Sequence, residues 1–301
     1  MAYVVVLLSA AAGAAFGQSY KWKVALGLRT VPVTVWFSLL SSGMLAAVVL
    51  TLPSVLVTRS MIYTAAGYAS AMAVAMHSFY RVIENAKLGV SWTMIQLSVI
   101  VPFLAGVIFY DERLTVLAAL GVAAVVVSIL LFGRSRERTG APGSHPSLGS
   151  VLYLTIATVA TGITATTLRI FKSFSTNDAA IPTFLLMASL FLLAINSVIY
   201  FISSRLRTVS SGDPAGYRLW ERRLILFSIY KCVTNVTAIG LLMLALQRLP
   251  GYFVFPVRNT LSILLVYILS TTIFRERLNG SEVAGAIAAI VGIAALSIAT
   301  A

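Results

Sequence analysis

The chain has 301 residues, of which 59% are hydrophobic and only 10% are charged, with a mean hydropathy of +0.95 and a net charge of +13. This composition excludes a water-soluble globular protein, in which charged residues make up about a quarter of the chain. Of the 22 basic residues, 20 are spread over the polar joints. They form no basic domain, so the net charge does not indicate nucleic-acid binding.

Apolar runs of about 20 residues, each long enough to cross a ~30 Å hydrocarbon core as a helix, recur along the whole chain. The sequence therefore predicts an all-α membrane protein with ten transmembrane helices. The predicted spans are 2–20, 31–57, 61–80, 88–109, 114–133, 149–168, 180–204, 224–247, 252–274 and 281–300. The first run lacks the basic start of a signal peptide, and the apolar pattern resumes after Lys23, so we interpret it as the first span.

The chain matches itself at an offset of 164 residues. The matched positions are Leu97-Ser98 with Leu261-Ser262, Glu112-Arg113-Leu114 with Glu276-Arg277-Leu278, Gly121 with Gly285, and Val127 and Ile129 with Val291 and Ile293. We predict two repeats, residues 1–133 and 149–301, separated by a polar joint at 134–148. Five spans in each repeat is an odd number, so the second copy enters the membrane inverted, which is typical of secondary transporters.

Two segments share a Glu-Arg-Leu turn between apolar runs: FYDERLTVLAALGVAAVVVSILL at 109–131 and FRERLNGSEVAGAIAAIVGIAAL at 274–296. They resemble the junction between the fourth and fifth helices in the ten-helix, EamA-like branch of the drug/metabolite transporter (DMT) superfamily. FYRVIENAKLGVSWTMIQLS at 79–98 resembles the preceding junction, so the resemblance covers essentially the whole chain. It implies a transporter of small molecules, in a family that includes amino-acid and drug exporters and metabolite carriers.

The orientation in the membrane stays open between two indications. Of the Lys and Arg residues in the joints, 15 fall in odd-numbered joints and five in even-numbered ones. The positive-inside rule then places both termini outside. The resemblance implies the opposite, with both termini in the cytoplasm, and we expect the membrane to be a bacterial or archaeal cytoplasmic membrane.

Lys231 interrupts the apolar run 224–247 with no carboxylate within seven residues on either side. Its backbone is expected about 8 Å below the nearer interface, so the side chain can either extend to that interface or face a wet cavity and attract an anion. Asn235, one helical turn further on the same face, would add a hydrogen-bonding side chain.

Arg258 lies nearer to the centre of its span and follows Pro256. Its guanidinium can bind carbonyl groups left unpaired at the proline, or it can clamp a carboxylate or phosphate. Counted along their helices, Lys231 and Arg258 differ in depth by about 10 Å, which is wide enough to bracket a small ligand.

The nine acidic residues all lie in joints or at helix ends, and none is near the centre of a predicted span. Lipophilic-cation antiporters of the four-helix type depend on an embedded glutamate, so their substrates are disfavoured here. Two buried cations favour an anionic or zwitterionic substrate.

Further candidates are polar or amphipathic residues in the helices that line the cavity in the family that the chain resembles. These are Gln18, Tyr20, Tyr80, Trp92, Gln96 and Thr166. Each has a structural alternative, either in an interfacial aromatic belt or in a hydrogen bond between helices. His77 is either a packed histidine or a proton relay.

We therefore predict a secondary transporter that moves a small anionic or zwitterionic metabolite, with a proton or another ion as the coupling species. The alternatives are a lipid-phosphate flippase or another lipid-handling protein, and a drug exporter. One cysteine and two separate histidines form no disulfide or metal-ligand set, and no embedded nucleophile–base set is present, so we expect no cofactor and no enzymatic activity. The protein is expected to be a monomer or a homodimer.

Overall fold

The computed structural model describes residues 2–52, 57–83, 92, 95–99, 101–102, 105, 115–135, 148–175, 177–211, 220–273 and 280–299. The regular structure in these ranges is entirely helical. The helices are α1 (Ala2–Ala25), α2 (Thr30–Leu50), α3 (Arg59–Ile83), a 3-10 turn η1 (Leu97–Val99), α6 (Val116–Ser135), α7 (Leu148–Phe174), α8 (Ala180–Ser211), α9 (Arg222–Arg248), α10 (Gly251–Ile273) and α11 (Gly280–Ala299).

Each of these α-helices coincides with one predicted span, whereas the predicted span 88–109 falls largely outside the described residues. Both Glu-Arg-Leu turns and most of the joint at 134–148 also fall outside them. Within the described residues, five helices are long and apolar enough to cross a membrane, which indicates a helical membrane protein. They comprise Ala2–Ala25, Thr30–Leu50, Leu152–Phe174, Ala180–Arg205 and Arg222–Arg248.

Four predicted boundaries were wrong, and one of them is the end of α7, which continues to Phe174 instead of 168 and so includes Arg169 and Lys172. α1 continues to Ala25, so Lys23 is helical rather than in a joint; it is 3% exposed and donates to the Thr30 hydroxyl at 2.8 Å. α2 ends at Leu50 instead of 57, because the residue before Pro53 is disfavoured in a helix. α8 continues to Ser211, past the end of its apolar run.

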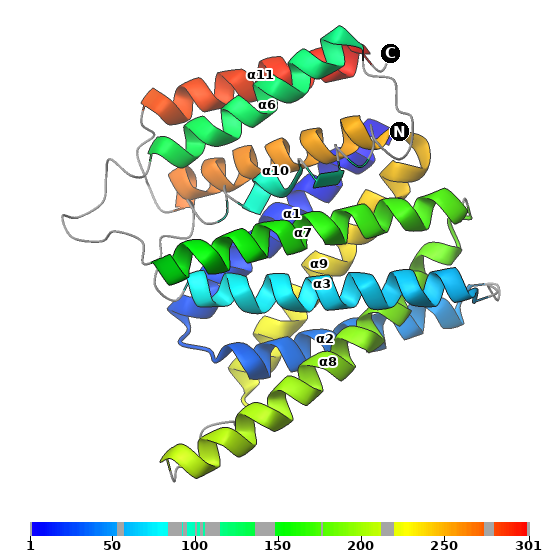
Figure 1. Ribbon diagram of the computed structural model, residues 1–301, viewed down its shortest axis with the longest axis vertical. Coiled ribbons are helices and arrows are strands. Elements are labelled where there is room, and N and C mark those ends of the chain that lie inside the picture. The colour runs from blue at the N-terminus through cyan, green and yellow to red at the C-terminus, as the bar shows by residue number, and fades with distance from the viewer. Residues whose placement is uncertain are drawn as a thin grey trace.

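The helices form a bundle in which α6 and α11 pair along one edge and α2 and α8 pair near the opposite one (Figure 1). Between these pairs, α1 packs against α9 and α10, and α3 packs against α7 and α8. α9 also packs against α2, so α2, α3, α8 and α9 meet in the interior.

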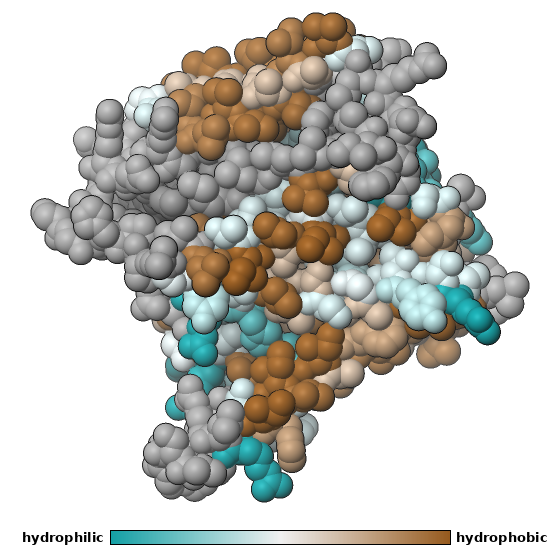
Figure 2. Space-filling view, in the orientation of Figure 1, coloured by the Kyte–Doolittle hydropathy of each residue, from teal (hydrophilic) through white to brown (hydrophobic). Residues whose placement is uncertain are grey.

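Apolar side chains cover much of the outside of this bundle, as Figure 2 shows over α6 and α11. Leu120, Ile287 and Ile290 are more than half exposed, at 62%, 59% and 61%. In contrast, Lys231 and Asn196 are buried. Apolar residues outside and polar ones inside are what a protein surrounded by lipid needs, because ionisable groups in a membrane face the bundle interior.

Candidate functional site

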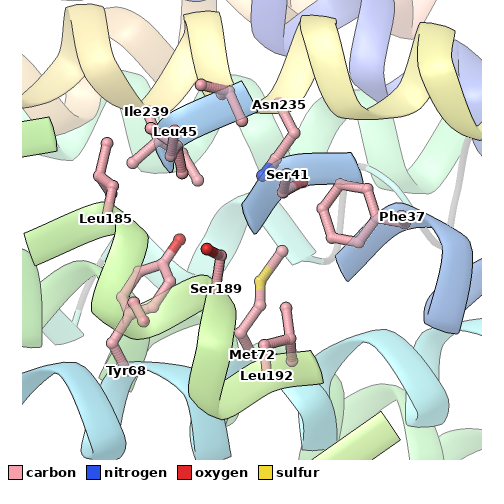
Figure 3. A pocket seen from close by; sticks show the side chains of 12 residues that line it. Phe37, Ser41, Leu45, Tyr68, Met72, Leu185, Ser189, Leu192, Asn235 and Ile239 are labelled. Atoms are coloured by element: carbon pink, nitrogen blue, oxygen red, sulfur yellow. The ribbon is translucent and has the colours of Figure 1, made fainter. Parts of the chain in front are cut away.

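A small, partly open cavity of about 30 Å³ lies where α2, α3, α8 and α9 meet (Figure 3). The lining is mostly apolar, with Phe37 and Leu45 from α2, Met72 from α3 and Leu185 from α8 among the contributors. Such a lining suits a ligand with an apolar body.

Four polar side chains interrupt this lining: Ser41, Tyr68, Ser189 and Asn235. The hydroxyl oxygens of Tyr68 and Ser189 lie on the cavity side in Figure 3. Ser189 also accepts a hydrogen bond of 3.1 Å from Ser42, which connects α2 with α8. A few hydroxyls and one amide can orient a polar group of a ligand against the apolar wall.

Lys231 is fully buried on α9, and its ammonium lies among four aromatic rings. The Nζ atom is 3.9 Å from the ring centre of Tyr20, 4.5 Å from Tyr80, 5.1 Å from Phe16 and 5.6 Å from Phe37. It also donates a hydrogen bond to the Tyr80 hydroxyl. We call these four rings the aromatic cage. Because cation–π contacts stabilise a desolvated ammonium by about 2 kcal/mol, the side chain lies in the interior and does not extend to the interface.

The aromatic cage adjoins the cavity. Phe37 belongs to both, and Asn235, one turn after Lys231 on α9, lines the cavity. Lys23 lies against the same Tyr80 ring, with its Nζ 5.0 Å from the ring centre. This side of the cavity therefore carries positive charge.

Arg258 on α10 is partly buried against the bare backbone of α1 at Gly13. A methyl group built on Gly13 would lie 2.8 Å from Nη2 of Arg258, so glycine leaves the space that the guanidinium fills. Nη1 donates to Oδ1 of Asn259 at 3.3 Å, and Nε is buried without a described partner. The described bond of Arg258 is thus to a side chain, and not to a carbonyl freed by Pro256.

Arg258 also lies close enough to Tyr68 to interact with it electrostatically, and Tyr68 lines the cavity. On α1, Arg258 contacts Gly13, whereas Lys231 contacts Phe16 and Tyr20. Three to seven residues of helix correspond to about 5–10 Å of rise, so the two cations lie at different levels along α1.

The remaining predicted residues divide into two groups. Tyr20 and Tyr80 form part of the cage, and the Trp92 ring lies tilted against Tyr20 with 6.1 Å between ring centres, so these three are buried together and form no interfacial belt. Thr166 donates to the carbonyl of Gly162 in its own helix and does not line the cavity.

Gln18 and Gln96 are both buried, at 7% and 5% exposure. Oε1 of Gln18 has no described hydrogen-bond partner. Neither side chain lines the described cavity.

Sequence reasoning missed Phe16, Phe37, Tyr68 and Ser189. Aromatic and small residues are common in every span, so their identity alone gives no signal. The spacing of Phe16 and Tyr20, one turn apart on one face, could have indicated a shared aromatic surface.

A second polar cluster joins three helices beside the cage. Nε2 of His77 on α3 lies 3.0 Å from Oδ1 of Asn196 on α8. Nδ2 of Asn196 donates to the Ser38 hydroxyl at 2.7 Å and to the Thr34 carbonyl at 3.4 Å, both on α2. Asn196 is 1% exposed, so this cluster is part of the interior.

The fold recurs among solved structures, of which 28 chains match. One of them, described as "Crystal structure of protein", superposes with a TM-score of 0.69 over 98% of this chain and 98% of its own, at 12% sequence identity. At that identity the likeness shows the fold alone. Neither a protein-family model nor a curated protein sequence matches the chain.

Proposed function

We propose that the protein is a secondary transporter with ten transmembrane helices in two inverted repeats, similar to EamA-like members of the DMT superfamily, and that it moves a small anionic or zwitterionic metabolite. The observation that carries the proposal is a pair of cations, the buried Lys231 and the partly buried Arg258, near a central, mostly apolar cavity.

The pairing of helices supports the repeats. The first half consists of α1, α2, α3, η1 and α6, and the second half of α7, α8, α9, α10 and α11. When the elements are matched in this order and each is replaced by its counterpart, every major helix contact becomes another contact that is also observed. The contact α1–α9 becomes α7–α3, α3–α8 becomes α9–α2, and α1–α10 becomes α7–η1, while α2–α8 and α6–α11 each map onto themselves. This is the contact pattern of a pseudo-two-fold axis between the halves.

The charge balance supports an anionic group in the substrate. The acidic side chains that the structure describes lie at helix ends: Asp178 is 4.0 Å from Arg248 near the surface, and Glu221 immediately precedes α9. Within the described residues, no carboxylate therefore neutralises Lys231 or Arg258. An incoming carboxylate, phosphate or sulfonate would gain charge-assisted hydrogen bonds there, in a region of low dielectric constant.

The location of the cavity supports alternating access. It lies between α2 and α3 of the first half and α8 and α9 of the second. A rocking motion of one half against the other would open it to either side in turn. The hydroxyl contact between Ser42 and Ser189 is a small polar interface that such a motion can break and remake.

Exchange of labelled solute in proteoliposomes tests the proposal. We choose phenylalanine, benzoate and benzenesulfonate as probes, because each combines an anionic group with an apolar body. We expect saturable exchange of at least one probe by the wild type and a loss of more than about 100-fold in the double variant Lys231→Met/Arg258→Gln. Arg59→Gln, at the exposed start of α3, is the matched control.

Exchange by the double variant at the wild-type rate would overturn the site. Movement of labelled phospholipid without any solute exchange would favour the lipid-handling alternative instead. If no probe is exchanged at all, the proposed substrate class is wrong.

A further inference from the structure

The polar cluster of His77, Asn196 and Ser38 is the feature of the interior that the proposed substrate site does not use. Its hydrogen bonds connect α3 and α2 of the first half with α8 of the second. A group located there is affected whenever the halves move relative to each other. Histidine is also the side chain whose ordinary titration falls between about pH 5 and 8.

The hydrogen bonds of the cluster indicate which ring nitrogen of His77 can accept an added proton. Nδ2 of Asn196 donates to Ser38, so Oδ1 of Asn196 is the acceptor for a hydrogen on Nε2 of His77. Nε2 carries this hydrogen in both the neutral and the charged ring. A proton from water therefore adds at Nδ1, and the bond to Asn196 persists.

Two cations among the described residues act on His77. Arg81, one turn along α3, and Lys231 on α9 both interact electrostatically with the imidazole. Other described ionisable groups on neighbouring elements are Tyr63, Tyr68 and Tyr80 on α3, Lys23 and Tyr20 on α1, Tyr200 and Arg205 on α8, Tyr230, Cys232 and the exposed Arg222 and Arg223 on α9, the exposed Glu221 before α9, and the exposed Tyr153 on α7. α2 has no ionisable residue between Thr30 and Leu50, and α7 and α8 have no charged residue before Arg169 and Arg205. Among the described residues, the charged groups that act on His77 are thus the cations Arg81 and Lys231.

We propose that His77 is a proton-binding site coupled to the occupancy of the neighbouring cavity, so that the transporter takes up one proton together with its anionic substrate. The inference rests on the proposed function. An anion beside Lys231 would offset the positive charge that Lys231 places near His77, and would thereby favour the protonated imidazole. By linkage, a proton on His77 strengthens anion binding by the same factor.

The coupling is testable in detergent with the full-length protein. The probe is benzenesulfonate, which stays anionic throughout, and its affinity is measured from the rise in Tm with probe concentration. We expect the wild type to bind about tenfold more tightly at about pH 5.5 than at about pH 8. His77→Asn should bind with the same affinity at both values.

His145→Asn, which replaces the other histidine of the chain, is the matched control and should behave as the wild type. A pH dependence that is identical in wild type and His77→Asn would overturn the inference. If His77→Asn does not fold, proton uptake by the wild type decides: addition of benzenesulfonate to a weakly buffered sample should remove up to one proton per chain from solution. Binding without proton uptake would also overturn it.

The two proposals fail in different ways. If benzenesulfonate, benzoate and phenylalanine all leave Tm unchanged at every pH, the anion site itself is wrong and the coupling fails with it. If a probe binds without any dependence on His77, the anion site stands and only the proton coupling is wrong.

Discussion

The two cations within the bundle, the buried Lys231 and the partly buried Arg258, have contrasting surroundings. The ammonium of Lys231 has four aromatic rings within 5.6 Å and the Tyr80 hydroxyl as an acceptor. The guanidinium of Arg258 has one side-chain acceptor, Asn259, and faces the bare backbone at Gly13, with Nε unpaired among the described groups. The protein compensates the charge of Lys231 internally and leaves much of the charge of Arg258 uncompensated.

This difference teaches that two intramembrane cations need not contribute equally. An anion that binds Lys231 must compete with the cation–π contacts, which are worth about 2 kcal/mol in a desolvated setting. An anion that binds Arg258 meets a planar group whose donors suit two oxygens at once. We therefore expect Arg258 to contribute more to binding than Lys231.

The largest expected effect is that of Arg258→Gln. Removing one partner of a buried charge pair costs about 2–5 kcal/mol, so we expect affinity for the best-bound probe to fall about 100-fold. Titration of Tm with the probe measures the change. Arg59→Gln is the control, since Arg59 lies at the exposed start of α3. If Arg258→Gln loses less affinity than Lys231→Met, Lys231 contributes more to binding than Arg258 and our expectation is wrong.

Lys231→Met should have a smaller effect on binding, about tenfold, because part of the gain from the anion is offset by the loss of the ring contacts. Its effect on stability separates binding from folding. Replacing a buried charge with an apolar side chain of similar length is often neutral or stabilising, so we expect Tm to stay the same or rise. Lys172→Met, at the far end of α7, is the matched lysine control. Wild-type affinity in Lys231→Met would show that the cage holds Lys231 away from the substrate.

The sequence predicted much of the fold because hydropathy in a membrane protein is a direct signal. Each described α-helix falls on one predicted apolar span, and the errors are at ends, where α1 includes Lys23 and α8 continues past Arg205. Where a helix ends beyond its apolar run depends on local contacts, such as the hydrogen bond from Lys23 to Thr30. The average hydropathy of a stretch of residues gives no information on such contacts.

The site was predictable only for its charged members. Lys231 and Arg258 stand out because a charge in an apolar run is rare. Phe16, Phe37 and Tyr68 do not stand out, because what makes them part of the site is the meeting of helices distant in the chain. That pairing depends on how α1, α2 and α3 pack against α9 and α10, which no single span encodes.

The smallest expected effect is also the most specific test of the comparison. In Gly13→Ala the new methyl group would lie 2.8 Å from Nη2 of Arg258 and displace the end of a flexible side chain, at little cost in stability. Gly43→Ala on α2 is the matched control, because a methyl group there meets nothing within 4 Å. Both substitutions favour the helix by about 0.5–1 kcal/mol, so the difference between them isolates the guanidinium position. We expect Gly13→Ala to weaken probe binding about threefold, or about 0.6 kcal/mol, and Gly43→Ala to leave it unchanged. Equal affinities in the two variants would mean that the position of Arg258 against α1 does not matter for binding, and that the open surroundings of its guanidinium serve packing alone.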